Sequence, residues 1–179
     1  MSLKPVVIFH DKCPDGIAAA WAASTVYGNL ATYVPASYGD PPPPVVDDEG
    51  APRDVVIVDF SYPRDALVRL YGEAKSLLVL DHHKTAREVC EGLPFCVFDM
   101  ERSGAGLTWD VLRPGEPRPG GLRDARVGAQ RVGRHLAGGR QDAQLRHQVG
   151  RLRRHRVVER GARLGLAQEH RLHHVAGGA

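Results

Sequence analysis

All eleven aromatic residues of this 179-residue chain lie at or before Trp109, so aromatic side chains can contribute to a core only in that part of the chain. Residues 1–115 carry 10 Lys and Arg against 16 Asp and Glu, a net charge of −6. Residues 116–179 carry 14 Arg against 5 acidic residues, a net charge of +9. The overall charge of +3 is therefore the sum of two unlike parts. We expect one compact catalytic domain over residues 1–115, which is long enough for a single core.

Residues 116–179 form an Arg- and Gly-rich tail, for which the sequence leaves three interpretations open. The tail has 11 Gly in 64 residues and no aromatic side chain, so we do not expect it to build a second core. It is a disordered extension, an arginine-rich arm that binds nucleic-acid phosphates, or an out-of-frame product of GC-rich DNA. The last interpretation places a frameshift or truncation near residues 113–120.

Composition excludes several classes of protein. No stretch approaches 18 apolar residues, which excludes a transmembrane helix, and no signal-peptide pattern follows the N-terminus. The three cysteines, Cys13, Cys90 and Cys96, contain no CxxC pair, so neither a disulfide framework nor a zinc ribbon is expected. These features predict a cytoplasmic protein without a membrane partner.

Short apolar runs alternate with helical patterns along the first 115 residues. The expected strands cover residues 4–10, 31–35, 54–60, 76–80 and 95–99, and the expected helices cover residues 16–27, 63–74, 84–91 and 103–112. This alternation predicts an α/β fold with a mostly parallel sheet and helices on both faces. The near-continuous apolar strands agree, because strands of such a sheet are buried on both sides.

Polar residues follow the ends of these strands, where parallel α/β sheets bind their ligands. They are His10, Asp15, Asp59, Asp81, His82 and His83. Imidazoles and carboxylates that meet at one edge suit a transition metal such as Mn, Zn, Fe or Co. One carboxylate can bridge two ions, and two ions ~3.5–4 Å apart activate a water and stabilise charge on phosphorus oxygens.

His82 and His83 are neighbours in an extended segment, so their side chains point in different directions and suit different ligands. We assign His82 to a metal and His83 to a substrate phosphate. Further phosphate contacts are expected from Lys84, Arg102, Ser103 and Gly104. The last two would offer free backbone amides at a helix N-terminus, which favours anions.

Four ordered motifs over residues 4–112 resemble those of the DHH phosphoesterase family. They are His10-Asp-Lys-Cys-Pro-Asp15-Gly16, the Val-Asp-Phe around Asp59, Asp81-His82-His83, and Ser103-Gly104-Ala105. The resemblance implies a metal-dependent, usually manganese-dependent, hydrolase of oligonucleotides, single-stranded DNA, cyclic dinucleotides or pyrophosphate. By position it implies a metal site formed by His10, Asp15, Asp59, Asp81 and His82. It also implies that Asp59 is the bridging carboxylate and that His83 contacts the substrate phosphate.

The sequence departs from the family pattern in two places. Many family members carry two aspartates in the first motif, two residues apart, whereas Cys13 occupies the earlier position here. The first metal is then held more weakly, through Cys13, or through water. After the Ser103-Gly104 motif, no clear acidic ligand or second, substrate-gripping domain follows.

The leading hypothesis is a cytoplasmic phosphoesterase that cleaves phosphodiester bonds in nucleotides or short nucleic acids with a hydroxide activated by two metals. Two Mn²⁺ ions are expected, with Mg²⁺, Co²⁺ or Zn²⁺ as alternatives, and Asp81 and His83 are the predicted catalytic residues. The alternative is a catalytically defective nucleic-acid-binding protein with a basic arm, or an inactive truncated product.

Overall fold

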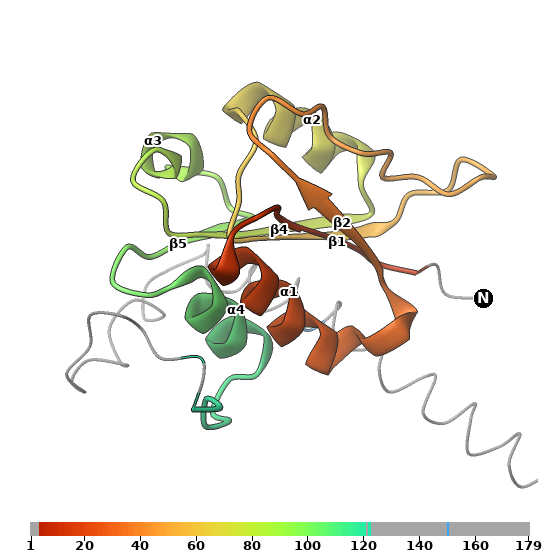
Figure 1. The fold of residues 1–179 in the computed structure, drawn as a ribbon. Coiled ribbons are helices and arrows are strands. Elements are labelled where there is room, and N and C mark those ends of the chain that lie inside the picture. The colour runs from red at the N-terminus through yellow and green to blue at the C-terminus, as the bar shows by residue number, and fades with distance from the viewer. Residues whose placement is uncertain (1–3, 121, 123–149, 151–179) are drawn as a thin grey trace, which may run out of the picture.

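Five short apolar strands form one parallel sheet in the order β2-β1-β3-β4-β5. The computed structural model describes residues 4–120, 122 and 150 (Figure 1). The strands are β1 (Val6–His10), β2 (Thr32–Ala36), β3 (Asp54–Val58), β4 (Ser76–Asp81) and β5 (Cys96–Phe98). All neighbouring pairs are parallel, so the carboxyl ends of the strands meet at one edge.

Helices cover both faces of this sheet (Figure 1). One face carries α1 (Pro14–Tyr27) and α4 (Gly104–Leu112), and the other carries α2 (Arg64–Glu73) and α3 (Ala86–Cys90). A short 3-10 helix, η1 (Gly28–Leu30), leads into β2. The predicted α/β fold is confirmed, and the bounds of each predicted element differ from the observed ones by at most two residues.

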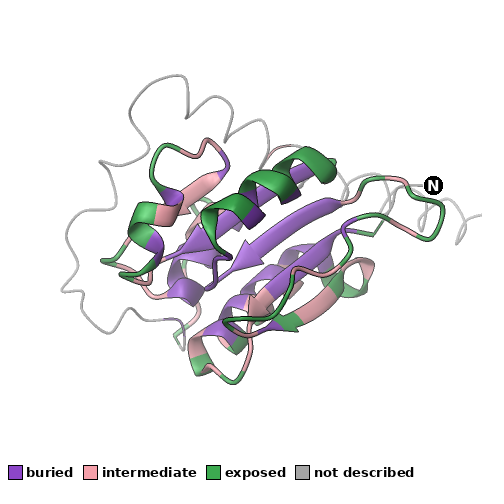
Figure 2. Ribbon diagram, turned by 90° about the horizontal axis from the view of Figure 1, so that it is seen from above, coloured by how far each residue is buried: buried purple, intermediate pink, exposed green. Residues whose placement is uncertain are grey.

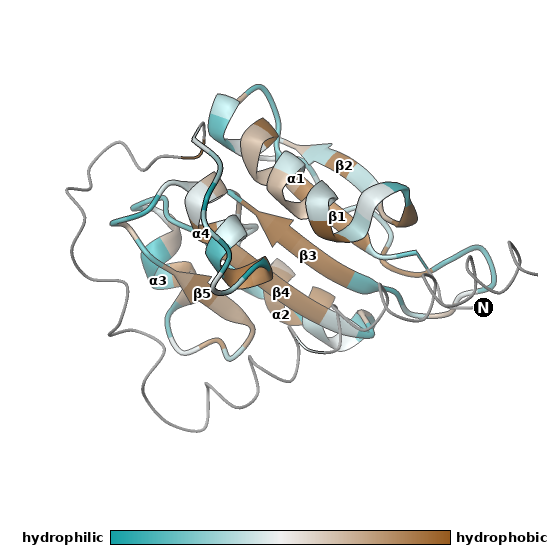
Figure 3. Cartoon of the chain, turned by 90° about the horizontal axis from the view of Figure 1, so that it is seen from below, coloured by the Kyte–Doolittle hydropathy of each residue, from teal (hydrophilic) through white to brown (hydrophobic). Residues whose placement is uncertain are grey.

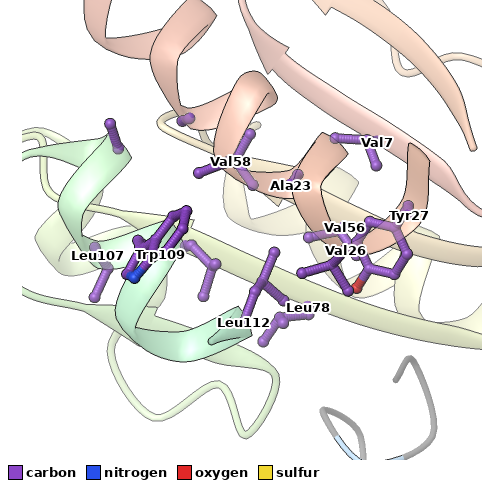
Figure 4. Packing of buried hydrophobic residues seen from close by; sticks show 14 of the residues in the cluster. Val7, Ala23, Val26, Tyr27, Val56, Val58, Leu78, Leu107, Trp109 and Leu112 are labelled. Atoms are coloured by element: carbon purple, nitrogen blue, oxygen red, sulfur yellow. The ribbon is translucent and has the colours of Figure 1, made fainter. Parts of the chain in front are cut away.

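The two central strands, β3 and β4, are buried along their whole length, which explains their continuous apolar sequences (Figures 2 and 3). Alternate side chains face opposite layers, as the pleat requires. Val56, Val58 and Leu78 pack with the α1 and α4 layer, where Val26 and Leu112 lie (Figure 4). The intervening strand residues pack under α2, which exposes its opposite side to solvent (Figure 2).

The strand order creates a switch point between β1 and β3. The chain leaves β1 for β2 at one edge of the sheet and then returns to β3 on the other side of β1. In sheets of this kind, ligands bind outside the carboxyl ends of the strands at the switch point. His10 is the last residue of β1, and Asp59 directly follows β3.

The predicted tail at residues 116–179 lies almost entirely outside the described residues. Of its described part, Arg118 donates from Nε to Asp110 Oδ1 at 2.8 Å, and Leu122 is buried in the core of the α1 and α4 face. Packing therefore continues past the predicted domain boundary at residue 115. Within the described part of the chain, no helix has the length and apolar character needed to cross a membrane.

Candidate metal centre

Asp59 lies at the centre of the polar cluster at the switch point. Its side chain is fully buried, and its two carboxylate oxygens meet imidazole nitrogens, with no backbone amide or hydroxyl of the described residues donating to them. Asp59 Oδ2 lies 3.7 Å from His10 Nδ1, and Asp59 Oδ1 lies 3.0 Å from His82 Nε2. The Nδ1 atom of His10 is likewise buried without a hydrogen-bond partner among those residues. The two oxygens of one carboxylate thus face two imidazoles from different strand ends.

The backbone at Asp59 explains why β3 ends at Val58. Asp59 has a φ of 55°, in the left-handed region that side chains other than Gly adopt with difficulty. Aspartate is among the residue types best tolerated there. The Asp59 amide still donates to Leu80 O at 2.8 Å, which fixes the residue against β4. Backbone strain of this kind is found most often at functional sites.

Two groups of side chains in the described part of the chain are spaced to hold a metal ion. One comprises His10, Cys13 and Asp59, and the other comprises Asp59, His82 and His83. In each group, one potential ligand atom per residue lies within 4.8 Å of the others. Asp59 belongs to both groups, which is the position that a bridging carboxylate would occupy.

Asp81 is the last residue of β4 and is hydrogen-bonded through one of its two carboxylate oxygens. Its Oδ1 accepts hydrogen bonds from the amides of His82 (2.7 Å) and His83 (3.1 Å) and from His83 Nδ1 (2.7 Å). Asp81 is fully buried and belongs to neither metal group. Asp81 Oδ1 thus orients the His83 ring, whereas Asp81 Oδ2 is buried without a hydrogen-bond partner among the described residues, so the metal role of Asp81 stays a prediction.

Three pKa shifts follow from these contacts. Burial by itself raises the pKa of Asp81, but the hydrogen bonds from His83 outweigh it and bring the pKa below its usual value. The hydrogen bond to Asp81 raises the pKa of His83. The contact with Asp59 raises the pKa of His82. Both imidazoles therefore hold a proton more strongly than a solvent-exposed histidine does.

The Asp15 carboxylate, predicted to be a metal ligand, is hydrogen-bonded to the N-terminus of α4. Its Oδ2 accepts from the Gly104 amide at 2.7 Å, and its Oδ1 accepts from the Ala105 amide at 2.9 Å. These bonds join the first turn of α1 to the N-terminus of α4. The Asp15 carboxylate also lies 3.4 Å from His82 Nε2. The Gly104 amide, predicted to be free for a substrate phosphate, is therefore occupied by Asp15.

The other predicted phosphate contacts, Arg102, Ser103 and Lys84, have different surroundings. The Arg102 guanidinium forms ion pairs with Asp99 Oδ2 and Asp110 Oδ2, both at 3.1 Å, so its charge is already paired with carboxylates of the protein. The Ser103 hydroxyl caps α4 by accepting from the Gly106 amide at 3.0 Å. Lys84 is exposed directly after His83, at the edge where the cluster lies.

The prediction from sequence missed Tyr38 and Phe60, which surround the imidazoles. The Tyr38 ring centroid lies 5.2 Å from that of His10, 6.4 Å from that of His83 and 5.1 Å from that of Phe60. Phe60 is buried, whereas Tyr38 is 57% exposed. Tyr38 lies two residues past the end of β2, so the strand-end rule that identified the polar residues would also have identified it.

Comparisons with known proteins support the fold. No family model matches the sequence. An uncharacterized protein of Acanthamoeba polyphaga mimivirus is 31% identical over 127 residues, which cover 64% of this chain and 30% of the viral protein. A solved structure of an uncharacterized protein from Helicobacter pylori matches with a TM-score of 0.51 and 15% identity, over 63% of this chain and 36% of that one. The chain thus spans only about a third of the length of these relatives, and the structural likeness shows the fold alone.

Proposed function

We propose that this chain is a metal-dependent phosphoesterase domain of the DHH type that hydrolyses phosphodiester bonds in nucleotides or short oligonucleotides. The observation that carries the proposal is the Asp59 carboxylate, fully buried and flanked by the imidazoles of His10 and His82, at 3.7 Å and 3.0 Å. A buried carboxylate in this state is unfavourable unless a positive charge compensates it. A protonated His82 supplies part of that charge in the metal-free protein, and a bound divalent cation would supply it in the metal-loaded protein.

The donor atoms fit such an ion. Imidazole nitrogen and carboxylate oxygen together favour Mn, Zn, Co or Fe over Ca or Mg. His10 and Asp59 would hold one ion, and Asp59 and His82 would hold a second. When bound, these ions would supply Lewis-acid polarisation of a phosphate oxygen and an activated water.

His83 is suited to contact the substrate phosphate. Asp81 accepts the hydrogen bond from His83 Nδ1, which leaves Nε2 as the ring nitrogen available to a substrate oxygen. Because the same bond raises the pKa of His83, the positively charged form persists to higher pH. A fixed imidazolium can neutralise a phosphate oxygen or deliver a proton to a leaving alkoxide.

The exposed ring of Tyr38 favours a substrate that carries a nucleobase. Phe60 supports one part of this ring, and more than half of the Tyr38 surface is accessible beside the metal groups. Nucleobases stack on such rings with little dependence on sequence. A nucleotide bound through its phosphate at His83 would therefore find an aromatic surface within reach.

Hydrolysis of bis-p-nitrophenyl phosphate by the full chain tests this proposal. We expect turnover only after Mn²⁺ is added to metal-stripped protein, and loss of turnover with EDTA. His83→Ala should lower kcat by about 100-fold or more, the usual contribution of a positioned proton donor. Asp48→Asn, in an exposed loop position, is the control.

Turnover that survives chelation, or a fully active His83→Ala variant, contradicts the proposal. A chain that is inert with every metal yet binds single strands with a steep salt dependence supports the alternative binding function.

A further inference from the structure

We propose that Cys13 supplies a thiolate ligand to the metal ion held by His10 and Asp59. The inference rests on metal binding at the proposed site, but it does not depend on phosphoester hydrolysis. It assigns the first metal position a sulfur, nitrogen and oxygen donor set, in place of the two-carboxylate set that the family resemblance implies.

The Asp15 carboxylate, the other candidate ligand of the first motif, is bonded to α4. Both of its carboxylate oxygens accept backbone amides of α4, at 2.7 Å and 2.9 Å. Asp15 belongs to neither group of potential ligands in the described part of the chain. Turning the Asp15 carboxylate toward a metal would weaken the two charge-assisted hydrogen bonds that join α1 to α4.

Cys13 lies directly before α1, close to His10 and Asp59. It is the N-cap residue of α1 and has an extended backbone (φ −110°, ψ 123°). Its carbonyl oxygen accepts from the Ile17 amide at 3.0 Å, so its place beside the helix is fixed. The sulfur lies within 4.8 Å of ligand atoms of both His10 and Asp59. Cys13 forms no disulfide and is half-buried.

His10 and Asp59 are the other two candidate ligands at this position. Asp59 is fully buried, and His10 Nδ1 is buried without a hydrogen-bond partner among the described residues. Asp59 Oδ2 faces His10 Nδ1 at 3.7 Å and likewise has no such partner, so both atoms remain available to an ion near the Cys13 sulfur. A fourth position is available to water or substrate, as in open metal sites.

The chemistry of sulfur then determines which ion is preferred. Thiolates favour Zn²⁺, Co²⁺ and Fe²⁺, whereas Mg²⁺ and Mn²⁺ favour oxygen donors. The group of Asp59, His82 and His83 has only nitrogen and oxygen donors. The two positions that share Asp59 are therefore chemically different, and the Cys13 position selects the more thiophilic ion.

Cobalt substitution of the full chain tests this inference without an activity assay. Metal-stripped protein is titrated with Co²⁺, and the near-ultraviolet thiolate-to-cobalt charge-transfer absorption is recorded alongside the visible ligand-field bands. We expect the charge-transfer band in the wild type, its loss in Cys13→Ser, and its retention in Cys96→Ser, which changes another partly buried free cysteine. Zn²⁺ affinity should fall at least about tenfold in Cys13→Ser, since loss of a group that only orients a ligand already costs about 10–100-fold.

The outcomes separate this inference from the proposed function. Visible cobalt bands without the charge-transfer band, or a band unchanged in Cys13→Ser, overturn the Cys13 assignment and leave metal binding intact. A folded wild-type chain that binds neither Co²⁺ nor Zn²⁺ overturns both. Alkylation of wild-type Cys13, followed by peptide mass spectrometry, needs no variant. Saturating Zn²⁺ should slow this alkylation strongly, and an unchanged rate overturns the assignment.

Discussion

Gly104 lies so close to Asp59 that a Cβ atom on residue 104 would be 2.1 Å from Asp59 Oδ1 and 2.6 Å from Asp59 Cβ. The first turn of α4 is therefore in direct contact with the central carboxylate of the site. Asp59 has little room to move away, because its amide is bonded to Leu80 O and its φ is already in the left-handed region. The packing of α4 and the position of Asp59 are thus determined together.

Replacing Gly104 tests this relationship. Gly104→Ala should lower the free energy of unfolding by about 1–3 kcal/mol, the usual cost of an added methyl group in a filled site. It should also weaken metal binding, because either Asp59 or α4 must shift. Gly72→Ala in α2 is the matched control, since no heavy atom lies within 4 Å of the added Cβ. That change should be neutral or should raise stability by up to about 1 kcal/mol. Urea denaturation measures the free energy of unfolding of both variants. Equal effects of the two changes would contradict the close packing of Gly104 against Asp59.

Asp59→Asn should separate stability from metal binding. Asparagine has nearly the same shape and tolerates the left-handed backbone at this position. It removes a buried charge together with the 3.0 Å contact to His82 Nε2, so these opposing effects should leave the stability of the metal-free variant within about 1 kcal/mol of the wild type. Thermal denaturation with and without Mn²⁺ measures this. The wild type should be stabilised by the ion and the variant should not, whereas equal stabilisation of both would contradict the role of Asp59.

The stability of the metal-free protein should fall as the pH rises above about 6.5, the usual pKa of histidine. The hydrogen bond to Asp81 raises the pKa of folded His83, and the contact with Asp59 raises that of His82. Each contribution is complete below the pKa of the unfolded state and is lost as the pH passes through the higher pKa of the folded state. The lowered pKa of Asp81 affects stability at acid pH. The stability that Asp81 contributes is lost as the pH falls below about 3.8, the ordinary pKa of aspartate, and through the lower pKa of the folded state.

Urea denaturation in EDTA between about pH 5.5 and pH 8.5 checks this dependence. His83→Gln should reduce the decrease in the free energy of unfolding over this range, because glutamine does not titrate. A variant whose stability changes with pH as steeply as that of the wild type would show that the His83–Asp81 pair is not its source.

Tyr38 should contribute to substrate affinity more than to turnover. Stacking of one base on an aromatic ring contributes about 1–3 kcal/mol, so Tyr38→Ala should raise KM for a dinucleotide roughly five- to hundredfold with little change in kcat. Tyr38→Phe should retain wild-type KM, because it keeps the ring. Tyr71→Ala removes another exposed tyrosine, which is stacked on Phe95 on the α2 side of the sheet, and should leave KM unchanged. An unaltered KM in Tyr38→Ala would contradict stacking at this position.

The positions of His10, Asp59 and His82 were predictable because parallel strands bring their carboxyl ends to one edge of a sheet. The apolar runs before these residues were long enough to locate each strand end to within two residues. The sequence also indicated Asp59 as the shared carboxylate, through the family resemblance, and Asp59 is the residue common to both metal groups.

The engagement of Asp15 by α4 was not predictable. The two hydrogen bonds join residues 89 and 90 positions apart and depend on how closely two helices approach, which no local pattern records. The same bonds occupy the Gly104 amide that we had expected to be free. The role of Asp81 was obscured in a similar way, because the hydrogen bond from His83 Nδ1 depends on the turn after β4 and on the rotamer of His83.

We propose that the cluster around Asp59 hydrolyses phosphodiesters with the help of a divalent metal. Cleavage of a dinucleotide by the metal-stripped full chain, followed by mass spectrometry of the products as Mn²⁺ is added, tests it most directly. Wild type and Asp48→Asn should cleave the dinucleotide only when metal is present, and Asp59→Asn should remain at background. Folded, metal-loaded wild-type protein that leaves nucleotides and short oligonucleotides intact, or an Asp59→Asn variant as active as the wild type, would contradict the claim.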